Sequence, residues 1–317
     1  MQPFRVLSID GGGIRGIIPA VLLSALEQRA GKPVCELFDL IAGTSTGGIL
    51  ALLLTKPAAA GVPAYSAAAA LDLYTEHGAQ IFDASLWHRI RAVDDVLEQK
   101  YPAGPIETLL QQYFGVARLS EALTPVLIPG YEIEIREPWF FRSERAKAHP
   151  DKYDFLMWEV ARATSAAPTY FPPELIQQDA HNWALIDGGT FANNPGMCAW
   201  AEAARCAPDR GVLLASLGTG EHTRPVPYAQ AKDWGLLGWA RPILDIVFDG
   251  VSKTTDYELC QLIPRDRYYR FQLRLPLANN DLDNASAENI AALTAEAQKL
   301  ATSRSADLDR LCAALTN

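Results

Sequence analysis

Short apolar runs that end in glycine recur along this chain. Residues 5–9 are rich in β-forming residues and end at Asp10-Gly11-Gly12-Gly13. Residues 38–42 form a second apolar run, short enough for a buried strand, that ends at Gly43. Apolar residues at helical spacing follow the first run, and a continuous apolar segment, 48–54, follows the second. Two such strand-turn-helix units predict a parallel sheet covered by helices, with the chemistry in loops at the carboxyl ends of the strands.

The same analysis predicts further elements along the rest of the chain. Strands are expected at 126–135, 139–141, 184–186 and 211–217, and helices at 66–82, at 155–164 and from Ser286 onward. The strand at 184–186 ends at Asp187-Gly188-Gly189, and that at 211–217 ends at Gly218-Thr219-Gly220. We find no internal repeat, and we expect residues 1–317 to form one domain.

Two segments fit this scheme less well. Residues 83–104 are irregular and charged, and we expect them to form a cap over the site, as we do for 222–257. Within the latter, residues 234–248 are unusually apolar, with Pro242 at a position that suits the first turn of a helix. The preferred interpretation is that 234–248 belong to the core; the alternative is an acyl-chain or membrane-facing wall.

Composition narrows the classes of partner. The 317 residues are 49% hydrophobic and carry a formal net charge of -9. Such a charge disfavours a nucleic-acid polymer as partner and adhesion to strongly anionic membranes. No secretory signal and no apolar run of membrane-spanning length is visible. Five scattered cysteines without a Cys-x-x-Cys pair suggest reduced thiols. We therefore expect a cytoplasmic protein, with peripheral membrane contact left open.

Ser45 is the candidate nucleophile. It lies between Gly43-Thr44 and Thr46-Gly47, at the turn between the second strand and its helix. A serine on a sharp strand-to-helix turn needs nearly side-chain-free flanking residues, and the turn lifts its hydroxyl clear of the sheet. Gly43, Thr44, Thr46 and Gly47 are thus predicted to form a nucleophile elbow. The motif is weak on its own, so a second element is needed.

The glycine loop after the first strand offers an oxyanion hole. It comprises Gly11, Gly12, Gly13, Ile14, Arg15 and Gly16. Glycines there let backbone amides approach a small anion closely. Arg15 is interpreted either as a residue that steadies the loop or attracts a phosphate, or as a surface charge. The loop also matches the dinucleotide pattern G-x-G-x-x-G, but the end of the next strand carries Ser45 instead of the acidic residue that holds a ribose.

The base is chosen between five histidines and an acid at a strand end. None of the histidines sits at a strand-end turn, although His181 lies just before the strand that ends at Asp187. Asp187 is followed by Gly188 and Gly189, so its carboxylate can lie at the same edge of the sheet as Ser45 without crowding. A Ser-Asp dyad follows. A carboxylate is a weak base toward serine, so this dyad requires partial burial and a strong oxyanion hole.

Three blocks together resemble the signature of patatin-like phospholipases. They are residues 10–16, residues 43–47 and residues 187–189, in this order, and residues 161–168, 193–195 and 216–220 also resemble family segments. The resemblance implies a three-layer α/β/α sandwich with a mainly parallel sheet. It also implies that Ser45 is the nucleophile, Asp187 the base, and the amides around Gly12, Gly13 and Ile14 the oxyanion hole.

The expected function is hydrolysis of fatty-acyl esters of phospholipids or lysophospholipids through an acyl-enzyme, without metal or cofactor. The cluster 279–284 suggests calcium superficially, but it lacks the glycine and distal glutamate of an EF-hand loop, so we expect a helix-start turn. Two alternatives stay open: an acyltransferase at the same site, and an effector whose phospholipase site is gated by a ligand such as a cyclic nucleotide activator.

Overall fold

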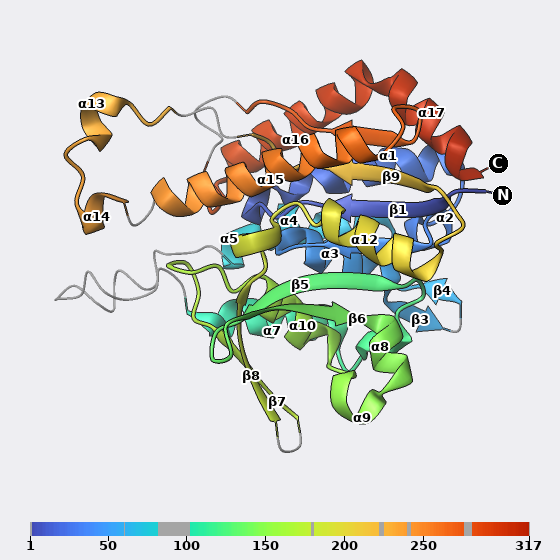
Figure 1. The fold of residues 1–317 in the computed structure, drawn as a ribbon, viewed down its shortest axis with the longest axis horizontal. Helices are drawn as coiled ribbons and strands as arrows, with labels where there is room; N and C mark the ends of the chain where they lie inside the picture. Colours follow the sequence, from blue (N-terminus) through green and yellow to red (C-terminus); the bar gives the residue numbers. More distant parts are fainter. Residues whose placement is uncertain are drawn as a thin grey trace.

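A central sheet organises the molecule (Figure 1). The computed structural model describes residues 2–59, 61–81, 102–178, 181–221, 225–239, 242–275 and 281–316. Its main sheet has eight strands in the order β10-β9-β1-β2-β5-β8-β7, and β6 pairs with β5. The strands of this sheet are β1 (Phe4–Ile9), β2 (Leu40–Gly43), β5 (Val126–Glu132), β6 (Glu137–Arg142), β7 (Glu174–Gln178), β8 (His181–Asp187), β9 (Val212–Leu217) and β10 (Tyr268–Phe271). A separate two-stranded sheet joins β3 (Pro57–Ala59) to β4 (Val62–Pro63).

Helices cover both faces of the sheet. One layer packs under the strands and contains α1 (Ile17–Ala30), α3 (Thr46–Thr55), α4 (Ala67–Thr75), α7 (Ala103–Phe114), α10 (Met157–Thr164), α16 (Ala287–Ser303) and α17 (Ser305–Thr316). The opposite layer contains α12 (Gly196–Cys206) and part of α15 (Pro242–Leu262). The short elements are η1 (Gly13–Gly16), α2 (Val34–Leu37), α5 (Gly78–Ile81), η2 (Leu119–Glu121), α8 (Ser143–Ala148), α9 (Pro150–Tyr153), α11 (Gly189–Ala192), α13 (Tyr228–Ala231) and α14 (Leu236–Trp239).

Alternation along the strands explains the two cores. Val6 and Leu40 belong to the core under α12, whereas their neighbours Leu7 and Ile41 belong to the core that faces α1 and α3. Successive side chains of a strand point to opposite faces, so a strand that is apolar at every position is buried on both sides. The three-layer α/β/α architecture expected from the sequence is therefore confirmed.

β5 brings the ends of two other strands together. Its edge toward β6 is occupied over Leu127–Glu132, so β2 and β8 share its other edge. β2 runs parallel to β5, with Ala42 opposite Leu127, and β8 runs antiparallel, with Asp187 opposite Gly130. The carboxyl ends of β2 and β8 thus approach each other along one edge of β5. Three residues of strand separate the two pairing points, a span of roughly 10 Å.

Most predicted elements are present, and several details differ. The strand before Asp187 was expected as part of a parallel sheet, but β8 is antiparallel to β5. β7 and β10 were not predicted. The preferred assignment of residues 234–248 to the core is wrong, because no described side chain in that segment is buried and Leu236 is 88% exposed. The helix that Pro242 was expected to begin is α15. Of the expected cap 83–104, residues 83–101 lie outside the described residues.

The expected turn before the last predicted helix is confirmed. Ser286 caps α16 by accepting a hydrogen bond from the Asn289 amide, and the Asn284 side chain accepts one from the Ser286 amide. Residues 279 and 280 of that cluster lie outside the described residues. The five cysteines are all free thiols. None of the helices in the described ranges is both long and apolar enough to cross a membrane.

Candidate active site

Ser45 occupies a strained turn between β2 and α3. Its backbone has φ 54° and ψ -123°, a conformation that L residues other than glycine rarely adopt. The flanking glycines are required sterically. A Cβ at Gly43 would lie 2.1 Å from the carbonyl oxygen of Gly47, and a Cβ at Gly47 would lie 2.3 Å from that of Ile9. Both obstacles are backbone atoms, so the turn that the sequence predicted is packed against β1 without room for a methyl group.

Hydrogen bonds from three threonines hold this turn. The Ser45 amide donates to Oγ1 of Thr164, which itself donates to the Pro129 carbonyl of β5. Thr44 Oγ1 donates to the carbonyl of Ala192, just beyond the Asp187 turn. The Thr46 and Tyr74 hydroxyls are 2.7 Å apart. The elbow is thereby tied to β5, to the acid turn and to α4, which stabilises its unfavourable backbone angles.

Asp187 lies at the end of β8 beside Ser45. Its carboxyl group is buried and accepts a hydrogen bond from the Gly189 amide at 2.7 Å, and the Ser45 side chain lies close enough to influence its pKa. Burial raises the pKa of Asp187 to about 7, although the Gly189 amide and the Ser45 side chain lower it. Gly188 lets the chain turn against β5, because a Cβ there would lie 2.4 Å from the Pro129 carbonyl oxygen. Ser45 and Asp187 therefore lie side by side as the sequence predicted, and the strand that brings Asp187 there is antiparallel to β5.

The glycine loop lies next to this pair, but its amides are not equivalent. The Ile14 amide donates to the carbonyl of Leu282, and the Gly11 amide donates to that of Asn193. Within the described part of the chain, the amides of Gly12 and Gly13 donate to no protein group. Gly13 has φ 58°, and a Cβ there would meet the Leu282 carbonyl. Of the three amides that the family resemblance assigned to the oxyanion hole, that of Ile14 is therefore already occupied.

Arg15 is a buried residue of the loop. Its side chain is 4% exposed, its Nε donates to the Gly12 carbonyl and its Nη1 donates to the Gly220 carbonyl, both at 3.3 Å. Burial lowers the pKa of Arg15 to about 10, so the guanidinium stays charged at neutral pH. The interpretation of Arg15 as a surface charge is wrong, and it steadies the loop as the first alternative expected.

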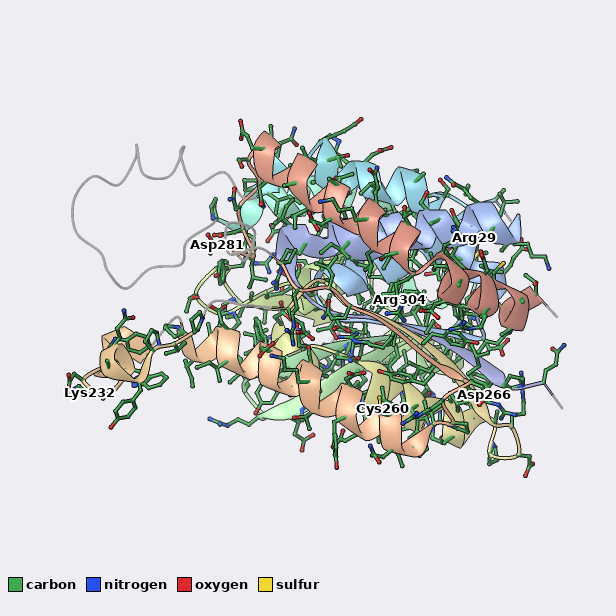
Figure 2. All side chains as sticks on the ribbon, turned by 90° about the horizontal axis from the view of Figure 1, so that it is seen from above. Arg29, Lys232, Cys260, Asp266, Asp281 and Arg304 are labelled. Carbon is green, nitrogen blue, oxygen red and sulfur yellow. The ribbon has the colours of Figure 1, made fainter. Side chains whose placement is uncertain are left out.

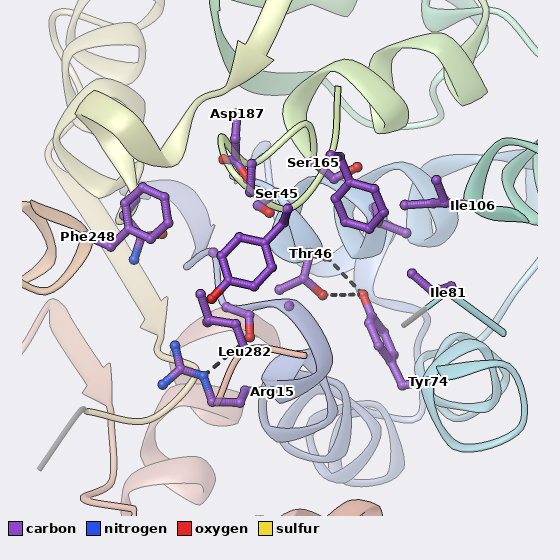
Figure 3. A pocket seen from close by; sticks show the side chains of 18 residues that line it. Arg15, Ser45, Thr46, Tyr74, Ile81, Ile106, Ser165, Asp187, Phe248 and Leu282 are labelled. Carbon is purple, nitrogen blue, oxygen red and sulfur yellow. Dashed lines mark hydrogen bonds between the residues drawn. The ribbon is translucent and has the colours of Figure 1, made fainter. Parts of the chain in front are cut away.

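A largely apolar cavity opens over Ser45 and Asp187 (Figure 3). Counted with its open mouth and the solvent space in front of it, it encloses about 690 Å³. Its apolar wall is formed by side chains from several elements: Ile49, Ile81, Ile106, Phe171, Phe248 and Leu282. Gly12, Gly13, Arg15 and Asn193 supply the polar side. Such a shape suits an acyl chain with a polar group at one end.

No described histidine lines this cavity. His181 begins β8 and stacks on Trp183 with the ring centroids 4.5 Å apart, six residues from Asp187 along an extended strand. His77 and His149 lie elsewhere, and His88 and His222 fall outside the described residues. Among the residues that the structure describes, no group of three or more metal-binding side chains is found. Among the described histidines and carboxyl groups, only Asp187 lines the cavity beside Ser45.

The sequence analysis overlooked several residues of this site. Thr164 falls within the segment 161–168 that resembled the family, yet no role followed from it. Asn193 joins three parts of the site: its carbonyl accepts from Gly11, its Nδ2 donates to Ser252 of α15 at 2.9 Å, and it lines the cavity. A threonine at the end of an amphipathic helix, directly before a cluster of small residues, was the available signal for Thr164. No comparable local signal marks Phe248 or Leu282.

Comparison with known proteins shows which family the chain resembles. Residues 7–200 match the family model described as patatin-like phospholipase. The chain is 36% identical over 288 residues to patatin-like protein 2 of Arabidopsis thaliana, covering 80% of this chain and 70% of that protein. It is 31% identical to the probable inactive patatin-3-Kuras 1 of Solanum tuberosum, covering 93% and 85%. The crystal structure of VipD from Legionella pneumophila aligns with a TM-score of 0.40 and 13% identity, covering 96% and 67%.

The chain therefore belongs to the patatin-like phospholipase family. Membership implies a lipid acyl hydrolase activity and a lipid substrate. The name of the Solanum tuberosum relative also indicates that activity is not guaranteed by similarity alone. The individual catalytic groups have to be argued from this chain's own residues.

Proposed function

We propose that this protein hydrolyses fatty-acyl esters of phospholipids or lysophospholipids, with Ser45 as nucleophile and Asp187 as general base. The observation that supports this best is the proximity of the Ser45 side chain to the buried Asp187 carboxyl group, since both line one apolar cavity and Ser45 influences the pKa of Asp187. A nucleophile in contact with its base is the geometry that covalent acyl transfer requires.

The reaction has two balanced halves. Ser45 Oγ attacks the ester carbonyl while its proton passes to Asp187, and the carbonyl oxygen becomes an oxyanion that the amides of Gly12 and Gly13 hold. The C–O bond to the alcohol breaks, and Asp187 returns the proton to the departing alkoxide. Water then attacks the acyl-enzyme and gives a proton to Asp187. Release of the fatty acid returns that proton to Ser45 Oγ.

The environment of Asp187 suits this role. A general base works best when its pKa lies near the operating pH, and burial raises the pKa of Asp187 to about 7. The raised pKa makes the carboxylate a stronger base than an exposed aspartate. We expect kcat/KM to rise with pH and to level off above about pH 7.

The oxyanion hole follows from which amides are open. The amides of Gly12 and Gly13 donate no hydrogen bond to another described protein group, whereas the amides of Gly11 and Ile14 each donate one to a backbone carbonyl. Two backbone donors are enough to stabilise a tetrahedral intermediate, and the loss of one such donor typically lowers kcat by about 10²–10³-fold. We therefore restrict the predicted oxyanion hole to Gly12 and Gly13.

Fatty-acid release from phosphatidylcholine and lysophosphatidylcholine tests the proposal. Wild type, Ser45→Ala and Asp187→Asn are compared, and we expect both variants to lose at least about 10³-fold in kcat. Thr190→Ala is a control next to the acid, since its hydroxyl donates to the main-chain carbonyl of Asp187 and not to the carboxyl group. Near-normal activity of Asp187→Asn would remove the base role from that residue. Transfer of the acyl group to an added alcohol, in place of its release, would indicate an acyltransferase.

A further inference from the structure

Exposed apolar side chains outside the catalytic cavity are concentrated in one segment of the chain. Of the twelve large hydrophobic side chains that are exposed in the described part of the chain, five fall within residues 226–246. They are Val226, Tyr228, Leu236, Ile243 and Ile246. Among the side chains that the structure describes, none between residues 225 and 251 is buried. We call residues 225–239 together with 242–247 the docking arm.

The docking arm projects from the edge of the sheet that carries Ser45. In Figure 1, α13 and α14 lie beyond the end of the sheet toward which β1 runs, separated from the main body. Figure 2 shows Lys232 near the tip of this segment, with α15 leading back to the body. Phe248, which directly follows the arm on α15, lines the catalytic cavity. The arm is therefore joined directly along α15 to a residue of the cavity wall.

The chemistry of the arm is that of a membrane interface. Trp234 and Trp239 pack edge to face with ring centroids 5.2 Å apart, and Tyr228 is 82% exposed. Tryptophan and tyrosine are enriched where membranes meet water, because each combines an apolar ring with a polar group. Residues 225–239 contain one lysine and one aspartate, so this part is neutral although the whole chain carries -9.

We propose that the docking arm inserts into the surface of a zwitterionic phospholipid bilayer, so that a lipid acyl chain passes along α15 and Phe248 into the cavity. This inference rests on the proposed lipid hydrolase function. The exposed aromatic side chains of the arm, and its direct connection along α15 to Phe248 of the cavity, favour a bilayer over a second copy of this chain as its occupant. The arm carries one lysine and two aspartates, so it has no excess of positive charge that would require an anionic lipid, and the acidic body is repelled by one.

Co-sedimentation with phosphatidylcholine vesicles measures this binding directly. Ser45→Ala protein is used so that the lipid stays intact, and Leu236→Asp is added to it. Val116→Asp is the matched control, because Val116 and Leu236 are both 88% exposed and neither lines the cavity. We expect Leu236→Asp to lower the partition coefficient by about tenfold or more and Val116→Asp to change it by less than about twofold.

Three further measurements decide the outcome. Binding should persist when NaCl is raised from about 0.05 to about 0.5 M, since it is apolar. Melting curves should show that both variants are folded. When Leu236→Asp is made in protein that retains Ser45, it should hydrolyse a soluble short-chain ester at the wild-type rate. Equal loss of vesicle binding in both variants overturns the inference, and so does no loss in either. A change in mass by light scattering with Leu236→Asp, without a change in vesicle binding, assigns the arm to a second copy and also overturns it.

The design separates this inference from the proposed function. If wild type releases no fatty acid and does not hydrolyse the soluble ester, the catalytic proposal fails, yet the vesicle experiment still reports on the arm. If the ester is hydrolysed normally while vesicle binding ignores Leu236→Asp, the catalytic proposal stands and the arm has no docking role.

Discussion

The elbow around Ser45 and the docking arm lie at the same edge of the sheet, but they differ in what surrounds them. Every residue of α3 is buried, and a methyl group at Gly47 would meet a backbone carbonyl at 2.3 Å. In the arm no described side chain is buried, and Leu236 is 88% exposed. The elbow is held by packing on all sides, whereas the described side chains of the arm lie at the surface.

This difference follows from what each region must do. A nucleophile and its base have to keep one geometry. The close packing and hydrogen bonds around Ser45 hold its backbone at the strained φ angle. A surface that meets lipid gains its burial only when the partner is present, so it carries apolar side chains without protein neighbours. Substitutions in the two regions should therefore have very different effects on stability.

The largest effect is expected from Gly47→Ala. The new methyl group would lie 2.3 Å from the Ile9 carbonyl and 2.8 Å from that of Asp10, and neither backbone atom can move away without disrupting β1. We expect a loss of about 4 kcal/mol or more in the free energy of unfolding, together with loss of activity. Denaturant titration measures it. Gly104→Ala is the control, since a Cβ there meets nothing within 4 Å, and equal stability of the two variants would contradict the steric argument.

The next effect is pH-dependent and concerns Asp187→Asn. The pKa of Asp187 is about 7 in the folded protein, above its ordinary value of 3.8, because its burial disfavours the charge. The folded state thus binds the proton more tightly, and stability falls as pH rises from about 4 to about 7. The neutral asparagine does not titrate, so the variant lacks this pH-dependent loss of stability. Relative to wild type, the variant should gain up to about 4 kcal/mol across that window and then level off.

Chemical denaturation at a series of pH values between about 4 and 8 tests this, since the window is set by the two pKa values of the group. A stability difference between Asp187→Asn and wild type that stays constant with pH would show that Asp187 is not held near pKa 7. Because the same substitution removes the proposed base, gain of stability and loss of activity should coincide. Such opposition is expected where a charged group is buried for function.

The sequence predicted the elbow around Ser45 better than it predicted the direction and pairing of β8, the strand that places Asp187 beside it. Glycine spacing around Ser45 is a local requirement of a tight turn, so it is visible in the sequence. The antiparallel direction of β8 depends on pairing with β5, whose partners are distant in the chain, and no local pattern encodes it. The engagement of the Ile14 amide by the Leu282 carbonyl joins residues that are 268 positions apart, and it was not foreseeable either.

The arm was misjudged for a related reason. Apolar composition indicates that residues 234–248 need an apolar environment, but it does not say whether protein or lipid supplies it. The C-terminal helix, by contrast, was predicted correctly, because Leu293, Ala297 and Leu300 recur on one face and that face is buried. Periodicity distinguishes one buried face, and residues 234–248 are apolar without such a period.

A moderate effect is expected from Thr164→Val. Valine has the shape of threonine but cannot accept the hydrogen bond from the Ser45 amide or donate one to the Pro129 carbonyl. Two polar groups lose a partner, so we expect a loss of about 1–3 kcal/mol in stability. The strained turn should loosen and kcat should fall by about tenfold, because Ser45 is less well positioned. Thr164→Ser keeps the hydroxyl and should retain most of the activity. If the serine and valine variants behave alike, the hydroxyl does not hold the elbow.

The smallest effect is expected from Leu236→Ala, and it is most informative beside Leu52→Ala. Leu52 of α3 is 0% exposed, and its truncation should lower the free energy of unfolding by about 2–5 kcal/mol, because it leaves a cavity in the surrounding core. Leu236 is 88% exposed, so the same change in the arm should alter the free energy of unfolding by less than about 0.5 kcal/mol. Denaturant titration of both variants without lipid measures this contrast.

If vesicles are then added, wild type should be stabilised against unfolding, since binding to the folded state alone raises its apparent stability. Leu236→Ala should gain less from the vesicles than wild type, whereas Leu52→Ala should gain as much, because its arm is intact. A large destabilisation by Leu236→Ala in the absence of lipid would mean that the arm already packs against protein in solution, and the contrast between the two regions would disappear.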